Sequence, residues 1–347
     1  MPRPQQLMRS PGPHPLPIFL AALQAACADD PARLATALAG LARYQQAPRP
    51  PKPPKRPEVA RIGGVSLRGR PGPHPVVIVP SLINPPDVLD LPGRSLMAHL
   101  ETAGFNPLII DWGDTPEPLG LMDLVSQRLH PLVAGLGQPV ALAGYCLGGT
   151  LALAQAAQRP VTRLALIAAP WNFAGYGAAQ REALANWWAS AQPLALALGQ
   201  VPMDLLQPAF WSLDPAGLAA KYVRLADASA SDVADFVRLE DWANGGAPIS
   251  LAAAQDMAEL YSTGRWPTID AGAITAPMLD VIAGTDRIVP PSAALSTLGI
   301  GTALRLDAGH VGMVVGRRAP ELLGAALADW LKAPPSSPQQ AQPAPVH

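Results

Sequence analysis

Cys146 is one of only two cysteines in the chain, and its sequence context suits a nucleophile. It lies in the run Gly144-Tyr145-Cys146-Leu147-Gly148, between an apolar β-prone stretch and a small-residue helical pattern. This G-x-C-x-G spacing predicts a strand, a sharp turn and a helix, with glycines where a Cβ two residues before or after the apex would collide. The N–H of Leu147 would then lie at the helix N-terminus, aimed at any negative charge that forms there. A buried structural cysteine is the alternative.

A nucleophile at such a turn needs an acid and then a histidine later in the chain. His310 is the histidine that follows the turn inside the predicted fold, on a loop just past an expected strand. Asp286 lies directly after the strand expected over residues 278–283, whereas Asp280 lies within it and is expected to face a helix layer. Either residue could be structural by itself. Three such groups at strand ends in this order favour a Cys–His–Asp triad, with Asp286 as the preferred acid.

The elements that must position these residues alternate along the chain. We expect strands at residues 76–79, 107–110, 140–143, 161–168, 278–283 and 303–306, and helices at 94–102, 119–136 and 320–331. This alternation predicts an α/β protein with a doubly wound, mostly parallel sheet and right-handed crossovers. Together with the turn at Cys146 it indicates the α/β-hydrolase fold, with Cys in place of the usual Ser nucleophile.

The alternation stops at residues 171–273, which hold six of the eight tryptophans of the chain: Trp171, Trp187, Trp188, Trp211, Trp242 and Trp266. An insertion at this point would form a helical cap above the active site. Alternatively, the aromatic side chains form the core of the insert itself, and we expect this for most of them. The catalytic core is therefore predicted over residues 59–170 and 274–332.

The two ends of the chain are rich in proline, and we expect residues 1–15 and 333–347 to be disordered. Residues 16–47 predict one or two helices, with a break near Asp30-Pro31 and an aspartate cap on the second. Residues 48–58 predict a polyproline spacer that carries four positive charges in solvent. Leu16 to Ala28 could serve as a signal peptide, but its short apolar run favours the start of a soluble helix.

The composition excludes several classes of function. The 347 residues, 49% of them hydrophobic, suffice for one large α/β domain with appendages. A formal net charge of −1 gives no electrostatic basis for nucleic-acid binding. Two cysteines make no disulfide framework, which fits a reducing, cytoplasmic compartment. No segment reaches the roughly 18 consecutive apolar residues that a membrane span needs, and we expect neither a metal nor a bound cofactor.

Several motifs resemble those of polyhydroxyalkanoate (poly-3-hydroxybutyrate) synthases, most of all the short class III catalytic subunit. In the core they are Pro80 to Asn84, Val88 to Leu91, Ile110 to Gly113, Gly144 to Thr150, Asp286 to Pro290 and Gly309 to Gly312; in the insert they are Phe210 to Pro215 and Leu239 to Trp242. The resemblance spans roughly residues 76–330. The family usually has aromatic residues beside the catalytic pocket where this chain has Pro85-Pro86-Asp87.

This resemblance implies roles for individual residues. Cys146 would accept the acyl group, His310 would act as base with Asp286 as its partner, and the backbone N–H groups of Leu147 and Ile83 would form the oxyanion hole. The substrate implied is a 3-hydroxyacyl-CoA and the product a polyester chain at a granule surface, with the CoA thioester as substrate rather than cofactor. A small partner subunit and a homodimer are expected.

Two other functions stay open at this point. The triad does not itself decide between water and a hydroxyl as the acceptor of the acyl group, so a thioesterase, esterase or polyhydroxyalkanoate depolymerase of the same fold is the main alternative. A non-catalytic granule-binding or partner-binding protein that has kept the fold is the other. The complete set of Cys146, Asp286 and His310 argues against the second.

Overall fold

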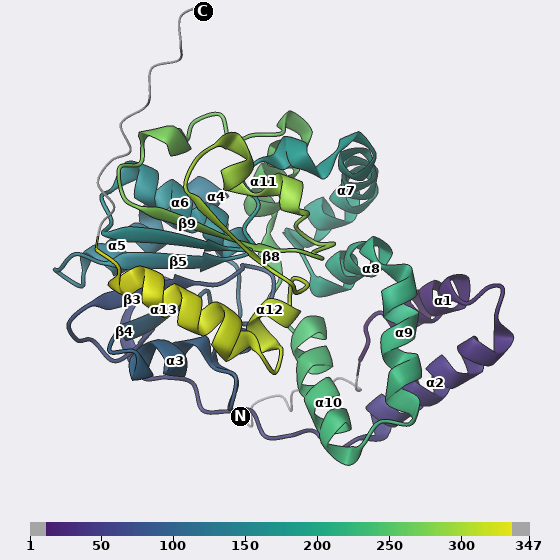
Figure 1. The fold of residues 1–347 in the computed structure, drawn as a ribbon. Helices are drawn as coiled ribbons and strands as arrows, with labels where there is room; N and C mark the ends of the chain where they lie inside the picture. Colours follow the sequence, from purple (N-terminus) through teal and green to yellow (C-terminus); the bar gives the residue numbers. More distant parts are fainter. Residues whose placement is uncertain (1–11, 335–347) are drawn as a thin grey trace, which may run out of the picture.

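The computed structural model describes residues 12–334, and an eight-stranded sheet forms its centre (Figure 1). The strand order is β1-β2-β4-β3-β5-β6-β9-β10. The strands are β1 (Glu58–Ile62), β2 (Val65–Gly69), β3 (Pro75–Val79), β4 (Asn106–Asp111), β5 (Ala141–Tyr145), β6 (Arg163–Ile167), β9 (Met278–Ala283) and β10 (Thr302–Leu306). Neighbours from β4 to β10 are parallel, and β1 and β2 add an antiparallel edge that the sequence reading missed. The predicted α/β, mostly parallel sheet is confirmed.

Helices cover both faces of the sheet, because successive residues of a buried strand point to opposite sides. Val77 and Val79 of β3 pack on one face with α6 (Leu147–Gln158), α4 (Leu121–Leu124), η2 (Val125–Leu129) and α5 (His130–Ala134). Val76 and Ile78 pack on the other with η1 (Pro86–Asp90), α3 (Leu96–Thr102), α12 (Gly312–Val315), η7 (Pro320–Gly324) and α13 (Ala325–Lys332). The helices expected at 119–136 and 320–331 form, but η2 and η7 are π-helical turns within them.

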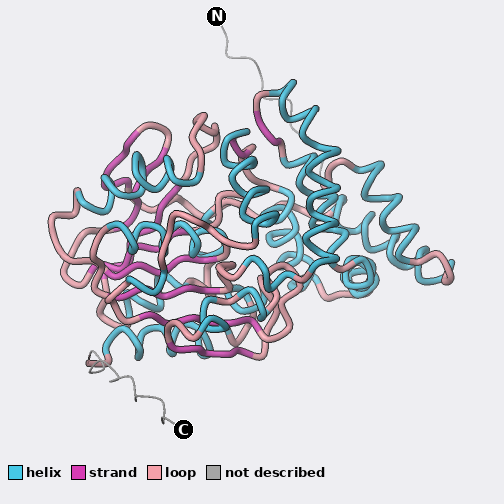
Figure 2. The backbone as a smooth tube through the Cα atoms, turned by 90° about the horizontal axis from the view of Figure 1, so that it is seen from above, coloured by secondary structure: helices cyan, strands magenta, loops and turns pink. Residues whose placement is uncertain are grey.

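Residues 171–273 form a mostly helical cap between β6 and β9. Its elements are η3 (Phe173–Tyr176), α7 (Ala178–Leu198), β7 (Gln200–Val201), α8 (Met203–Leu213), α9 (Pro215–Ala226), α10 (Ala230–Asn244), β8 (Ile249–Ser250), α11 (Leu251–Thr263) and η4 (Ala271–Ala273). Two short 3-10 turns, η5 (Pro291–Ala293) and η6 (Leu295–Leu298), follow β9. Figure 2 shows most of this helical part to one side of the sheet.

Two N-terminal helices, α1 (Leu16–Ala26) and α2 (Pro31–Gln46), pack on the cap rather than on the sheet (Figure 1). Asp30 caps α2 by accepting the N–H of Arg33, as the sequence predicted. The ring of Phe19 lies 5.1 Å from Trp211 and 5.2 Å from Tyr222 of the cap. This packing gives the apolar face of each short helix a partner.

The basic linker, residues 48–58, is not the solvated spacer that its sequence predicted. Arg49 pairs with Asp241 of the cap, Lys55 with Asp111, and Arg56 with Asp90 and Glu101. Only Lys52 among its four charges has no such partner within residues 12–334. These pairs tie the linker to the cap and the sheet.

The expected disorder over residues 1–15 does not extend to residues 12–15, where Gly12 and Pro13 are buried. The remainder of that stretch, and the tail from residue 335 onward, lie outside the described residues. Within residues 12–334 no helix is both long and apolar enough to cross a membrane.

Candidate active site

Cys146 lies at the apex of a sharp turn between β5 and α6, as the glycine spacing predicted. Its backbone has φ 54° and ψ −132°, a region that residues with a Cβ rarely occupy. A Cβ on Gly144 would lie 2.4 Å from the Cα of Gly149, and one on Gly148 would lie 2.1 Å from the carbonyl oxygen of Val79. Both glycines are therefore required for α6 to pack this closely against β5 and β3. The turn presents the thiol to a cavity.

His310 and Asp286 come together as predicted. Nδ1 of His310 donates to Oδ2 of Asp286 at 2.7 Å, and both side chains are buried. The other carboxylate oxygen, Oδ1, accepts the backbone N–H groups of Ile288 and Val289 at 2.8 and 2.9 Å. Because the loop after β9 holds the carboxylate in this way, Asp286 can fix the orientation of the imidazole and leave Nε2 free for the cavity.

The charge state of His310 depends on Cys146. Burial lowers the pKa of His310, but a negative charge on Cys146, hydrogen bonds with Asp286 and Cys146, and the charge of Asp286 outweigh burial. Together they raise the pKa of His310 from 6.5 to about 10. His310 can therefore hold a proton beside the sulfur of Cys146.

Asp280, the rejected candidate for the acid, lies elsewhere. Its Oδ2 accepts the N–H of Ser296 at 2.7 Å at the start of η6, and burial raises the pKa of its carboxyl group. This contact is with the backbone at the start of the 3-10 turn η6 and not with His310. His99 and His130 lie on α3 and α5, also away from the cavity lining.

The two expected oxyanion donors both line the cavity with Cys146. Leu147 is the first residue of α6, so its N–H belongs to the unpaired set at a helix start. The N–H of Ile83 already donates to Oγ of Ser81 at 3.4 Å, a long hydrogen bond. Ile83 thus lies at the site, but its N–H already takes part in this long hydrogen bond with Ser81.

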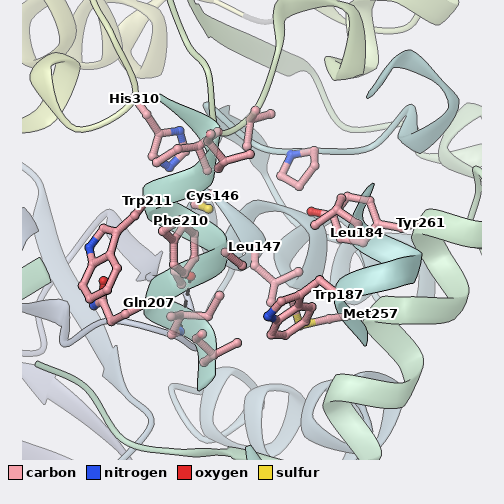
Figure 3. Close-up of a pocket in the computed structure, with 18 of the residues that line it drawn as sticks. Cys146, Leu147, Leu184, Trp187, Gln207, Phe210, Trp211, Met257, Tyr261 and His310 are labelled. Carbon is pink, nitrogen blue, oxygen red and sulfur yellow. Dashed lines mark hydrogen bonds between the residues drawn. The ribbon is translucent and has the colours of Figure 1, made fainter. Parts of the chain in front are cut away.

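The cavity next to Cys146 has a volume of about 620 Å³ and lies between the sheet and the cap (Figure 3). Its walls are mainly apolar and aromatic. Figure 3 shows His310 and Cys146 facing it, with Phe210 and Trp211 on one side and Trp187, Met257 and Tyr261 on the other. A pocket of this size and lining can enclose an acyl chain and keep water away from the sulfur.

Four of the six insert tryptophans contribute to this wall: Trp187, Trp188, Trp211 and Trp242. Trp171 and Trp266 instead pair with each other, with ring centroids 6.4 Å apart, in the main core. Trp187, Trp188 and Trp211 also pack in hydrophobic clusters of the cap, so they form part of the core of the insert as well as the wall of the cavity. Nε1 of Trp242 donates to the carbonyl oxygen of Pro85 at 2.8 Å, so the Pro-Pro segment positions this ring.

The sequence reading missed three tyrosines near Cys146. The hydroxyl of Tyr145 donates to the carbonyl oxygen of His310 at 3.2 Å, and its ring lies 5.1 Å from the imidazole. Tyr176 and Tyr261 both line the cavity. Only the position of Tyr145 directly before Cys146 offered a signal in the sequence. Among residues 12–334, no group of three His, Cys, Asp or Glu side chains converges as a metal site would require.

Comparisons with known proteins agree with this architecture. The model of the alpha/beta hydrolase family matches residues 76–326. The chain is 30% identical to the poly(3-hydroxyalkanoate) polymerase subunit PhaC of Haloferax mediterranei over 74% of this chain and 58% of that protein. It is 28% identical to the subunit of the same name from Allochromatium vinosum, over 75% of this chain and 81% of that protein. The similarity to polyhydroxyalkanoate synthases is thereby confirmed, although the chain spans less than two thirds of the Haloferax relative.

Solved structures give the same fold at lower identity. The monoacylglycerol lipase of Paleococcus ferrophilus superposes with a TM-score of 0.52 at 19% identity, covering 78% of this chain and 98% of the lipase. An alpha/beta hydrolase fold protein of Chitinophaga pinensis gives 0.50 at 15% identity, covering 84% and 99%. With the family match over residues 76–326, the parallel sheet and the turn at Cys146, the chain belongs to the alpha/beta hydrolase family.

Proposed function

We propose that this protein is an acyltransferase that polymerises 3-hydroxyacyl groups from CoA thioesters, with the acyl group carried on Cys146. The observation that carries the proposal is a thiol at the elbow, beside a His310 held by Asp286, that opens into an apolar cavity of about 620 Å³. The names of the relatives support the same activity.

Acylation moves one thioester bond to another. The proton of Cys146 passes to Nε2 of His310, and Sγ attacks the carbonyl carbon of the acyl-CoA. The new Sγ–C bond forms, the bond from that carbon to the CoA sulfur breaks, and the departing sulfur takes the proton from His310. Both compounds are thioesters, so the acyl group keeps its activation. The N–H groups of Leu147 and Ile83 would stabilise the negative charge on the carbonyl oxygen.

Chain growth uses the same three side chains. The hydroxyl of a second 3-hydroxyacyl unit gives its proton to Nε2 of His310, and its oxygen bonds to the carbonyl carbon held on Cys146. The C–Sγ bond breaks, an ester forms, and His310 returns the proton to the sulfur. Asp286 keeps the imidazole in the orientation that both steps need. Growth outcompetes hydrolysis only where water is excluded, and the aromatic cap provides this.

The deciding experiment is incubation of the full chain with 3-hydroxybutyryl-CoA. Insoluble polymer together with free CoA supports the synthase, whereas free 3-hydroxybutyrate with CoA would show a thioesterase and overturn the proposal. Cys146→Ala serves as the control for both products.

The resemblance also bears on assembly. The relatives are named as subunits, which supports a partner subunit for this chain. From the resemblance to class III synthases we propose that this partner is small and that the chain forms a homodimer at the surface of a cytoplasmic polyester granule. The incubation above is therefore run with and without a candidate partner, and sedimentation measures the mass of the assembly.

A further inference from the structure

A pair of tyrosine hydroxyls lies on the wall of the Cys146 cavity. Tyr176 ends η3, Tyr261 lies on α11, and the two rings meet edge to face with centroids 4.9 Å apart. The hydroxyl of Tyr261 donates to that of Tyr176 at 3.5 Å. Phe173 packs against Tyr261 from behind at 5.3 Å, so the pair has little freedom to turn away.

This pair leaves one donor unused. One hydrogen bond joins the two hydroxyls, so one of the two hydroxyl protons of the pair has no acceptor within residues 12–334. Tyr176 is buried, so the hydroxyl is largely shielded from bulk water. An unused buried donor is costly unless a ligand supplies the acceptor.

Both hydroxyls stay protonated at working pH. Burial raises the pKa of Tyr261 to about 12, with Cys146 adding to the shift and the hydrogen bond with Tyr176 opposing it. Burial, then Tyr261, then the charge of Cys146 raise the pKa of Tyr176 as well. The tyrosines are thus neutral donors, close enough to Cys146 for its charge to act on both.

The acyl group on Cys146 offers a limited choice of acceptors. In the mechanism proposed above its carbonyl oxygen faces the N–H groups of Leu147 and Ile83, and the next polar atom along the chain is the oxygen on carbon 3. In this part of the lining Leu184 lies beside Tyr261 and Met257 beside Trp187, and Gln180 and Arg181 also contribute to it (Figure 3). A polar atom that enters this wall is stabilised only where a donor meets it.

We propose that Tyr176 binds the oxygen on carbon 3 of the acyl group carried by Cys146, and that Tyr261 positions the Tyr176 hydroxyl for this contact. The inference rests on the acyl transfer proposed above and adds the means by which the site distinguishes 3-hydroxyacyl from plain acyl thioesters. The same oxygen is a hydroxyl in the first unit and an ester oxygen once the chain has grown.

The test is the ratio of single-turnover CoA release from 3-hydroxybutyryl-CoA and from butyryl-CoA, with intact-protein mass locating the adduct. Tyr176→Phe should lower the rate with the 3-hydroxy substrate by about tenfold, as loss of one hydrogen bond does, and leave the butyryl rate within about twofold. Tyr261→Phe should lower the ratio by about threefold through the same contact. The ratio does not depend on the fraction of folded enzyme.

Tyr44→Phe is the matched control, because it removes a hydroxyl that donates to Asp241 where the N-terminal helices meet the cap. Its ratio should equal that of the unmodified protein. An unchanged ratio in Tyr176→Phe, or equal losses with both substrates, overturns the inference. If Cys146 is acylated but no polymer forms, the proposed polymerising activity is wrong. The ratio of the two CoA-release rates still tests the proposed role of Tyr176 in that case. Absence of acylation by either substrate overturns both.

Discussion

At the scale of single residues, the site depends on backbone strain that its neighbours maintain. Cys146 is held at φ 54° and ψ −132°, with its N–H donating to the carbonyl oxygen of Ile167 at 2.9 Å. A conformation of this kind costs of order 1–3 kcal/mol and persists only where the surroundings enforce it. Gly144 and Gly148 remove the Cβ atoms that would prevent the close packing. The result is a thiol exposed to the cavity at the start of a helix.

Replacing the thiol should abolish acyl-enzyme formation without unfolding the protein. Cys146→Ala keeps a small side chain at the apex, so the turn should form as before. Radiolabelled 3-hydroxyacyl-CoA should label the unmodified protein and leave Cys146→Ala unlabelled. Cys146→Ser should retain slower transfer, because a hydroxyl is the weaker nucleophile. Equal labelling of the unmodified protein and the alanine variant would remove Cys146 from the mechanism.

Substitutions of Asp286 and Asp280 should differ sharply in their effect on turnover. Asp286→Asn should slow turnover by roughly 10²–10⁴-fold, since the carboxylate that orients and charges His310 is lost. Asp280→Asn should have a much smaller effect on turnover, because its contact is with the N–H of Ser296. Steady-state CoA release, with circular dichroism as the check on folding, compares them. A larger loss for Asp280→Asn in a folded protein would mean that the acid is misassigned.

At the scale of elements, the cap is the part of the site most able to change. Helix α9 presents Leu218 and Lys221 to the cavity, while Tyr222 faces the N-terminal helices. An ion pair of 3.6 Å between Asp214 and Arg287 joins the cap to the loop after β9, and both side chains are well exposed. Such a pair contributes little to stability, so it can break when the cap opens.

We predict that the cap opens to admit the CoA thioester and to release the chain. Its amide hydrogens in α7 to α10 should exchange faster than those of β3 and β5, because lids have low local stability. Exchange in the cap should slow when a substrate analogue or a partner binds. Hydrogen exchange with mass spectrometry measures this. A cap protected as well as β3 and indifferent to ligand would show that its tryptophans build a rigid wall.

At the scale of the whole molecule, Asp111 joins the linker to the sheet. It ends β4, is buried, and pairs with Lys55 of the linker at 3.0 Å and with Arg68 of β2 at 2.8 Å. Burial raises the pKa of Asp111, but hydrogen bonds with Lys55, with the N–H of Gly113 and with Arg68 prevail and lower it. The ion pair between Lys55 and Asp111 thus attaches the linker to the edge of the sheet.

Asp111→Asn should lower the free energy of unfolding by about 1–2 kcal/mol at pH 7, since Lys55 is half exposed and the pair is partly screened. A carboxyl whose native pKa is lowered stabilises the fold above its unfolded pKa of 3.8, and this contribution is lost as the pH falls through the lower native value. The difference between variant and unmodified protein in urea should therefore shrink in acid. Glu321→Gln, at the exposed ion pair with Arg318, is the control with little effect. A difference independent of pH would contradict this account.

Local sequence patterns predicted much of the architecture. The β-branched run at Val76 to Val79, the glycines around Cys146, and the strand ends before Asp286 and His310 predicted the sheet, the turn and the order of the site residues. These features depend on hydrophobic period and on backbone sterics, which act over a few residues and so are recorded in short stretches of sequence. The preference for Asp286 over Asp280 as partner of His310 followed from the same reasoning, and the 2.7 Å contact agrees with it.

Other features arose only from the path of the folded chain. The Tyr176–Tyr261 pair joins residues 85 positions apart, and Tyr145 reaches the carbonyl oxygen of His310 across 165 positions. Whether a tryptophan of the insert lines the cavity depends on how each cap helix is rotated, and helical spacing in the insert does not determine that rotation. The N-terminal helices carried an apolar face without indicating its partner, because burial of such a face is non-directional and any apolar surface could satisfy it. Tertiary packing determines that the cap is the partner of these helices.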